Sequence, residues 1–121
     1  MHFTKPLVLN SVIFHKFISA YLPSLTYEQK TDPSISPYFE DLEQFRGRLP
    51  KALFTCGTED PLLDDSLVMA AKWGMSGGDQ VLKIYPGACH GFIGFVGVLD
   101  EAGEALEDTK TFIREVLLEK S

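Results

Sequence analysis

Two loop segments of this sequence carry an acid and a base that could act together in catalysis. Asp60 stands in "CGTEDPLLDD" and His90 in "YPGACHGF", and each segment follows a short apolar run. A carboxylate that accepts a hydrogen bond from one imidazole nitrogen fixes the tautomer and leaves the other nitrogen to take a hydroxyl proton. The alternative is structural, with Asp60 as an Asx turn before Pro61 and His90 as an ordinary loop residue. Spacing alone favours this alternative, because both residue types are common in loops.

Other candidates surround this pair. Leu62 and Phe92 flank the acid and the base and could line an acyl pocket, although core packing is an equally good interpretation. Cys89 adjoins the histidine, but consecutive residues rarely present their side chains to each other, so a small buried thiol is expected. Asp60, Asp64, Asp65 and His90 together could be considered as metal ligands, but Asp64 and Asp65 occupy positions that suit the capping of a helix. We therefore predict no metal site at these residues, and we predict no cofactor.

The segment "GMSGG" at residues 74–78 matches the nucleophile-elbow pattern G-x-S-x-G. An elbow serine lies on a turn that leaves a strand and enters a helix. Ser76 has the reverse setting, after an expected helix over 63–73 that Gly74 would stop and before an expected strand over 80–85. Ser76 is therefore expected at the edge of the sheet opposite the strands' carboxyl ends, and not as a nucleophile.

The elements that must position the acid and the base form a strand, helix, strand unit. "KALFTC" and "QVLKIY" are short apolar runs bounded by Pro and Gly, and a helical pattern separates them. Such a unit favours parallel pairing, which brings both loops to one edge of the sheet. The expected elements of this single α/β domain are a helix over 7–22, an irregular connector over 23–50 with a short helical turn near 39–45, a strand over 51–56, a helix over 63–73, a strand over 80–85 and a helix over 101–119.

Composition excludes several classes of protein. The chain has 121 residues, with 11 Lys and Arg against 17 Asp and Glu, and its net charge of −6 argues against nucleic acid as a partner. No apolar run reaches the roughly 20 residues of a membrane span. The apolar N-terminal run loosely imitates a signal peptide, but His15 and Lys16 interrupt it. With only Cys56 and Cys89, reduced thiols and a cytoplasmic location are expected.

Several motifs resemble a known family when they are taken together. "DPSISPYFEDL", "LPKALFTCGTEDPLLDDSLVMAAKW" and "VLKIYPGACHGF" are similar to the C-terminal part of α/β-hydrolase-fold esterases of the hormone-sensitive-lipase type. The resemblance runs from about Asp32 to Phe95. It implies a partial α/β-hydrolase fold with the last two parallel strands and their flanking helices. It also implies that Asp60 is the triad acid and His90 the triad base of a carboxylesterase that acts on small acyl esters.

The departures from that family are equally informative. Its G-D-S-A-G nucleophile elbow and its H-G-G-G oxyanion loop do not occur in these 121 residues. The chain would then supply only the acid and the base, and it is expected to be inactive alone. The alternative is a catalytically silent remnant or interaction module. In either case the first strand would expose an unpaired edge that favours self-association.

Overall fold

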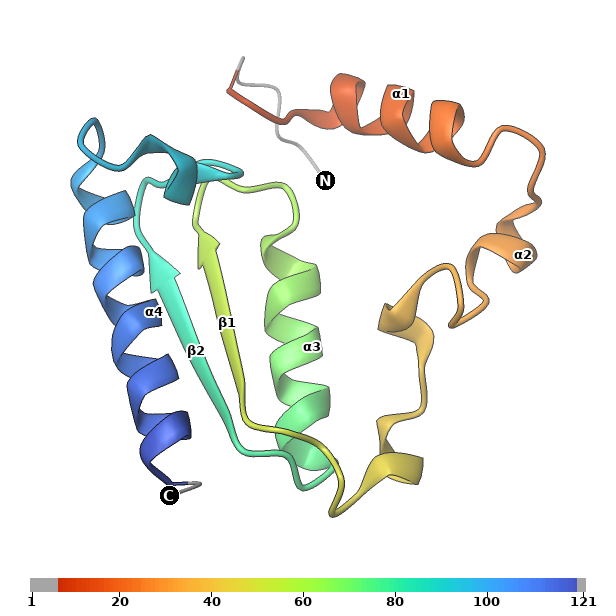
Figure 1. Cartoon of the computed structure of the whole chain (residues 1–121). Helices are drawn as coiled ribbons and strands as arrows, with labels where there is room; N and C mark the ends of the chain where they lie inside the picture. The colour runs from red at the N-terminus through yellow and green to blue at the C-terminus, as the bar shows by residue number, and fades with distance from the viewer. Residues whose placement is uncertain (1–6, 120–121) are drawn as a thin grey trace.

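The two apolar runs form a parallel pair of strands that lies between two helices (Figure 1). The computed structural model describes residues 7–119. The α/β fold class, with two parallel strands and flanking helices, is confirmed. In chain order, the elements are α1 (Ser11–Tyr21), α2 (Tyr27–Lys30), the 3-10 turns η1 (Pro37–Phe39) and η2 (Leu42–Phe45), β1 (Ala52–Gly57), α3 (Leu63–Met75), β2 (Gln80–Tyr85), the 3-10 turn η3 (Phe92–Phe95) and α4 (Asp100–Glu119).

The register of the strands aligns their carboxyl ends. Ala52 pairs with Gln80 at one end of the ladder, and Gly57 pairs with Tyr85 at the other. The loop after β1 and the loop after β2 therefore leave the sheet at the same edge. This is the edge at which open α/β sheets build their sites.

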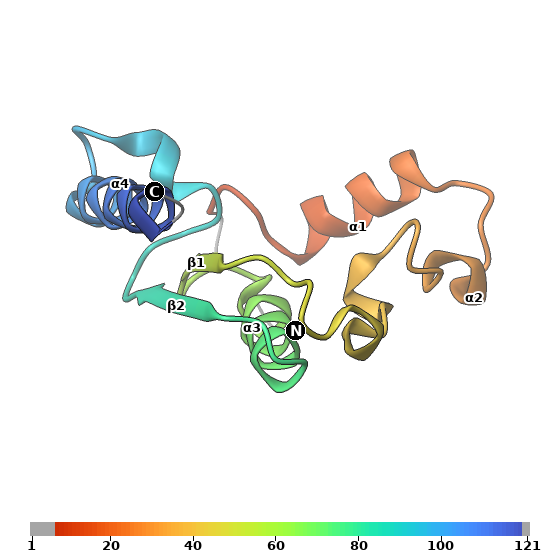
Figure 2. The same cartoon turned by 60° about the horizontal axis from the view of Figure 1, so that its bottom comes forward.

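The helices α3 and α4 cover opposite faces of the sheet (Figure 2). Alternate strand residues point to opposite faces. On one face, Phe54 of β1 packs against Trp73 of α3, with their ring centroids 6.0 Å apart. On the other face, the Tyr85 hydroxyl of β2 donates a hydrogen bond of 2.7 Å to Asp108 of α4.

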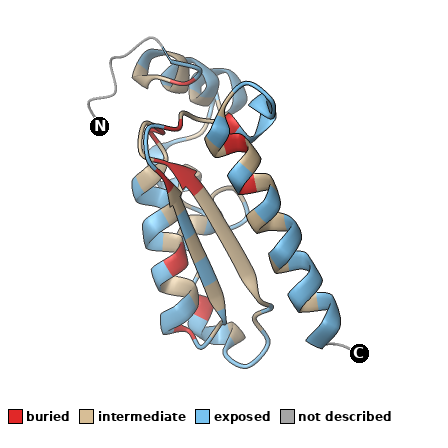
Figure 3. Cartoon of the chain, turned by 90° about the vertical axis from the view of Figure 1, so that its left-hand side faces the viewer, coloured by how far each residue is buried: buried red, intermediate tan, exposed pale blue. Residues whose placement is uncertain are grey.

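The packed core lies near the carboxyl ends of the strands. Buried positions gather at this end of the sheet and at the first turns of α4 (Figure 3). Alanines there let α4 approach the loop after β2 closely, because they add little bulk. The loops that carry Asp60 and His90 therefore adjoin the best packed part of the chain. The core cluster consists of Tyr85, Ala88, Phe92, Ala102 and Ala105.

The helix α1 begins later than its sequence pattern predicts. An N-terminus at residue 7 is expected, but α1 starts at Ser11 because the Asn10 side chain caps it, accepting a 3.0 Å hydrogen bond from the Ile13 N–H. No residue of α1 is buried, and Phe17 is 64% exposed. Within residues 7–119, no helix is long and apolar enough to cross a bilayer.

The helix α3 ends beyond Gly74, which does not stop it as expected. The stop is Gly77, which has a φ of 80° and follows the C-cap residue Ser76. The Gly78 N–H donates to the Trp73 carbonyl at 2.9 Å and the Gly77 N–H donates to the Gly74 carbonyl at 3.0 Å, the two bonds of a Schellman motif. The "GMSGG" segment is therefore a helix C-cap.

The other end of α3 also differs from expectation. No side chain caps the helix at Leu62, and Asp64 and Asp65 lie in its first turn. Negative charge in a first turn stabilises a helix through its dipole, without a capping hydrogen bond.

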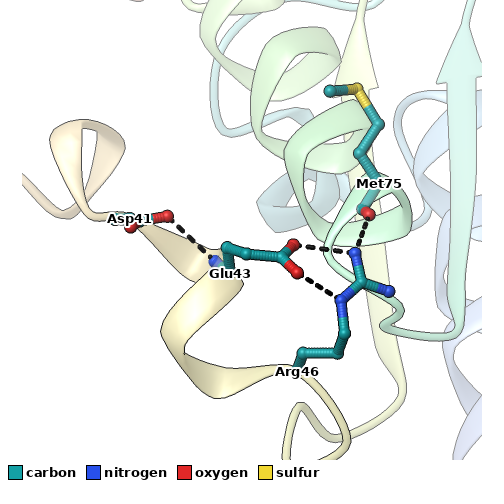
Figure 4. A network of polar contacts seen from close by, with 4 residues as sticks. All are labelled: Asp41, Glu43, Arg46 and Met75. Carbon is teal, nitrogen blue, oxygen red and sulfur yellow. Dashed lines mark hydrogen bonds and ion pairs between the residues drawn. The ribbon is translucent and has the colours of Figure 1, made fainter.

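The connector is more ordered than its composition suggests. It contains α2, whose capping box pairs Thr26 with Gln29. Its later part is attached to the last turns of α3. Arg46 pairs with Glu43 and donates to the Met75 carbonyl at 2.7 Å (Figure 4). These contacts fix the chain just before it enters β1.

Candidate active site

Asp60 is held in place by its own turn. It follows β1 in the segment "EDPL", and its residue is only 6% exposed. One carboxylate oxygen, Oδ1, accepts a 2.8 Å hydrogen bond from the Leu62 N–H. This is the Asx turn that the sequence offered as a structural explanation for Asp60. The turn fixes the orientation of the carboxylate and leaves Oδ2 available.

The second carboxylate oxygen meets the histidine. Oδ2 of Asp60 lies 3.0 Å from Nδ1 of His90, so the contact that the sequence predicted is present. A carboxylate can only accept, so Nδ1 carries the proton and Nε2 is the nitrogen left for a further partner. The histidine side chain is 40% exposed against 9% for the aspartate. The structural and the catalytic interpretations of Asp60 are therefore compatible, because Oδ1 forms the turn and Oδ2 contacts the histidine.

The histidine stands between two anchored neighbours. Cys89 packs against the core cluster on one side, as a half-buried free thiol. On the other side, Gly91 adopts a left-handed conformation with a φ of 69°, and Phe92 turns into the core. Both sides of the loop are thus fixed, which holds the imidazole beside Asp60.

The aspartate side of the pair is electronegative. Burial first, then the neighbouring Asp64 carboxylate and Asp60, raise the pKa of Asp65. Burial also raises the pKa of the Cys56 thiol, which keeps it protonated. Clustered carboxylates favour a positive charge nearby.

The structure gives each of the remaining candidates a different setting. Ser76 caps the far end of α3, at the amino-terminal edge of the sheet (Figure 1). Phe92 is 4% exposed, with its ring centroid 5.1 Å from that of Tyr85, so its observed contacts are core packing. Leu62 lines an open pocket of about 330 Å³ together with Tyr38 and residues of β1 and α3. Among the described residues, no group of three or more His, Cys, Asp or Glu side chains could hold a metal.

Sequence reasoning missed two residues at the contact between the loops that carry Asp60 and His90. Gly57 lets the loop after β2 approach β1, and the hydroxyl of Thr58 accepts a 2.8 Å hydrogen bond from the Gly87 N–H. A glycine at the end of a strand was the available signal, since it often marks a close backbone approach.

Comparison with known proteins identifies the family. Residues 2–94 match the family model described as the alpha/beta hydrolase fold. The chain belongs to this family. This α/β hydrolase is also 28% identical over 98 residues to the esterase LipU of Mycobacterium tuberculosis, covering 81% of the chain and 33% of that relative.

Solved structures support the same assignment. EstE1, a thermophilic and thermostable carboxylesterase cloned from a metagenomic library, superposes with a TM-score of 0.79 at 28% identity, covering 93% of this hydrolase and 36% of EstE1. A hormone-sensitive lipase from a metagenome library gives a TM-score of 0.64 at 30% identity, covering 71% of this chain and 28% of that one. The resemblance to hormone-sensitive-lipase-type esterases is thus confirmed. The chain spans about a third of the length of the relatives that it matches.

Proposed function

We propose that this chain supplies the acid and the base of a Ser-His-Asp carboxylic ester hydrolase that acts on small acyl esters without a cofactor. The observation that carries the proposal is the 3.0 Å contact between Asp60 and Nδ1 of His90 at the carboxyl edge of a parallel pair. Membership of the α/β-hydrolase family and the similarity to esterases support it. The nucleophilic serine and the oxyanion donors would come from the part of the hydrolase fold that these residues do not cover.

Under this proposal, each group has its own step. Nε2 of His90 would take the proton from the serine hydroxyl as the hydroxyl attacks the ester carbonyl, and would then give it to the leaving alcohol. In the second half of the reaction, Nε2 would take a proton from the water molecule that attacks the acyl group, and would then give it to the departing serine oxygen. Asp60 would keep the proton on Nδ1 and stabilise the imidazolium at each stage. Its own turn hydrogen bond to the Leu62 N–H keeps the carboxylate oriented.

A graft tests this proposal. Residues 52–95 of this chain would replace the matching segment of the LipU esterase, and turnover of a short p-nitrophenyl ester would be measured. We expect turnover that falls by about 10³-fold or more with His90→Ala and persists with Ser76→Ala, because Ser76 lies at the other edge of the sheet. A folded graft whose turnover is insensitive to His90→Ala would refute the proposal.

The chain alone provides a complementary test. We expect no more turnover of the same ester by the purified chain than by its His90→Ala variant, because an acid and a base without a positioned nucleophile cannot form the acyl intermediate. Saturable activity that disappears with both Ser76→Ala and His90→Ala would restore Ser76 as the nucleophile.

A second candidate function, interaction through the open edge of β1, rests on the pattern of the ladder. The N–H groups of Ala52 and Thr58 donate to carbonyls at Asp79 and Tyr85 on the β2 side. Alternation along a strand then directs the N–H of Thr55 to the other edge, where no further strand lies within residues 7–119. Such an edge can pair with a second copy of the chain.

The substitution Thr55→Pro tests pairing through this edge. Thr55→Pro removes a donor from the open edge and leaves the ladder to β2 intact, because the N–H of Thr55 points away from β2. If self-association occurs through this edge, sedimentation velocity should show a smaller oligomer for Thr55→Pro than for the wild type. An unchanged oligomer would exclude edge pairing.

A further inference from the structure

We infer that Thr58 is a positioning residue for the Asp60–His90 pair, acting through a hydrogen bond that ties the two catalytic loops together. The catalytic meaning of this inference rests on the function proposed above. Its structural content does not, because it concerns only how the two loops are held in register.

The loops exchange three hydrogen bonds close to the pair. The Thr58 N–H donates to the Tyr85 carbonyl at 3.1 Å, and the Glu59 N–H donates to the Ala88 carbonyl at 3.0 Å. In the opposite direction, the Gly87 N–H donates to the Thr58 hydroxyl at 2.8 Å. Two of these bonds join backbone groups that any residue would supply. The third needs a side-chain acceptor at position 58.

The Gly87 end of this bond belongs to a tight turn. Residues 85–88 read "YPGA", with proline at the second position, a φ of 80° at Gly87 in the third, and a 3.3 Å hydrogen bond from the Ala88 N–H to the Tyr85 carbonyl. This is the sequence and geometry of a type II turn. The central N–H of such a turn is free to bond outside it, and the Thr58 hydroxyl takes this N–H.

Close packing makes the loop geometry sensitive to this contact. A Cβ atom at Gly57 would lie 2.0 Å from the Ala88 carbonyl oxygen, so the backbones of the two loops are in direct contact. Asp60 follows Thr58 by two residues, and His90 follows Gly87 by three. A shift at the Thr58–Gly87 bond is therefore transmitted over a few residues to the 3.0 Å contact between the acid and the base.

The experiment compares Thr58→Val and Thr58→Ser in the full chain by NMR. Valine keeps the branched shape and removes the acceptor, whereas serine keeps the hydroxyl. In Thr58→Val we expect hydrogen exchange at the Gly87 amide to accelerate about fivefold and the Nδ1 proton signal of His90 to weaken or shift, with Thr58→Ser close to the wild type. Thr55→Val, the same substitution within β1 and three residues before Thr58, is the matched control and should leave both signals unchanged.

Two results would overturn the inference. One is a folded Thr58→Val variant whose Gly87 exchange and His90 signal match the wild type. The other is a Thr58→Ser variant that changes as much as Thr58→Val, which would assign the effect to the methyl group. Should Thr58→Val not fold, Thr58→Cys gives the same comparison with a weaker acceptor, and an unchanged His90 signal there would also overturn the inference.

These signals are independent of turnover. A His90 signal that depends on Thr58, together with a graft that has no esterase activity, would retain the positioning role and reject the proposed function. A His90 signal that does not depend on Thr58, together with an active graft, would reject the positioning role and retain the proposed function.

Discussion

Two regions of this molecule differ in how well they are packed. The C-terminal unit, residues 51–119, contains the sheet, the whole core cluster and the Asp60–His90 pair. The N-terminal arm, residues 7–50, buries only Leu9 and Leu42 among its described residues, and its helix α1 lies away from the sheet (Figures 1 and 2). The contrast shows that the acid and the base depend on local packing within the C-terminal unit. The arm depends on a few polar attachments to α3.

The largest difference between the two regions should come from removing an aromatic ring. Phe92→Ala empties a buried position in the core cluster and should cost about 3–5 kcal/mol of unfolding free energy, measured by urea denaturation. Phe17→Ala on α1 removes a ring that is 64% exposed and should change the same quantity by about 0.5 kcal/mol or less. Equal losses would mean that α1 is packed as firmly as the core.

The second largest effect should come from a single added methyl group between the loops. Gly57→Ala places a Cβ 2.0 Å from the Ala88 carbonyl oxygen, and the backbone movement that follows should cost about 1–3 kcal/mol. Gly103→Ala in α4 meets nothing within 4 Å and should be neutral or stabilising, since alanine favours a helix. The melting temperatures of Gly57→Ala and Gly103→Ala, each compared with the wild type, check this prediction. A stable Gly57→Ala variant would show that the loops have room to separate.

A smaller effect on stability, which depends on pH, should come from the contact between β2 and α4 and should have no counterpart in the arm. The hydrogen bond from the Tyr85 hydroxyl lowers the pKa of Asp108 in the folded state. The ionised carboxylate therefore stabilises the fold above its ordinary pKa, and this contribution disappears as the pH falls through the lowered value. Burial and the same hydrogen bond raise the pKa of Tyr85, so its hydroxyl stays protonated at neutral pH.

Tyr85→Phe measures this contribution. It should cost about 1 kcal/mol at neutral pH, and the difference from the wild type should shrink below about pH 4. Tyr21→Phe on α1, at a residue 76% exposed, is the matched control and should show no such dependence. Urea denaturation at several pH values provides the measurement. A difference that persists unchanged in acid would exclude the Asp108 carboxylate as the cause.

The smallest effect on stability should come from detaching the arm. The Lys72 ammonium of α3 donates to the carbonyls of Tyr38 and Glu40 and lies 5.6 Å from the centroid of the Tyr38 ring. Lys72→Met should speed hydrogen exchange over residues 37–45 while changing the unfolding free energy of the C-terminal unit by about 0.5 kcal/mol or less. Lys16→Met on α1 is the control. Unfolding of both regions together would contradict the division.

The sequence anticipated the C-terminal unit better than the arm, for a physical reason. The runs that became β1 and β2 are short, apolar and bounded by Pro and Gly, so one structure satisfies both their propensity and their burial. Their parallel order then places Asp60 and His90 at one edge without further information. For α1, the sequence predicted a helix, yet none of the residues of this helix is buried. Periodicity specifies a face and not what covers it.

Local contacts between segments were also beyond sequence reasoning. The end of α3 depended on which of three glycines takes a positive φ, and the Schellman bonds select Gly77 over Gly74. The roles of Gly57 and Thr58 depend on a loop about 30 residues away. A glycine at the end of a strand signals a close backbone approach, but no local pattern identifies the segment that approaches. A pairing such as Thr58 with Gly87 becomes visible only once the sheet has brought the two loops together.

The most direct test of the account is the turnover of the esterase graft with Asp60→Asn against that with Asp65→Asn. Both changes remove one negative charge from the same loop and helix start, but only Asp60 contacts the histidine. We expect Asp60→Asn to lower kcat by about 10³–10⁴-fold, because the amide cannot hold the imidazole in the tautomer that leaves Nε2 as a base. Asp65→Asn should stay close to the unsubstituted graft. A folded Asp60→Asn graft that retains full turnover, or equal losses in the two variants, would contradict the assignment of Asp60 and His90 as the acid and the base.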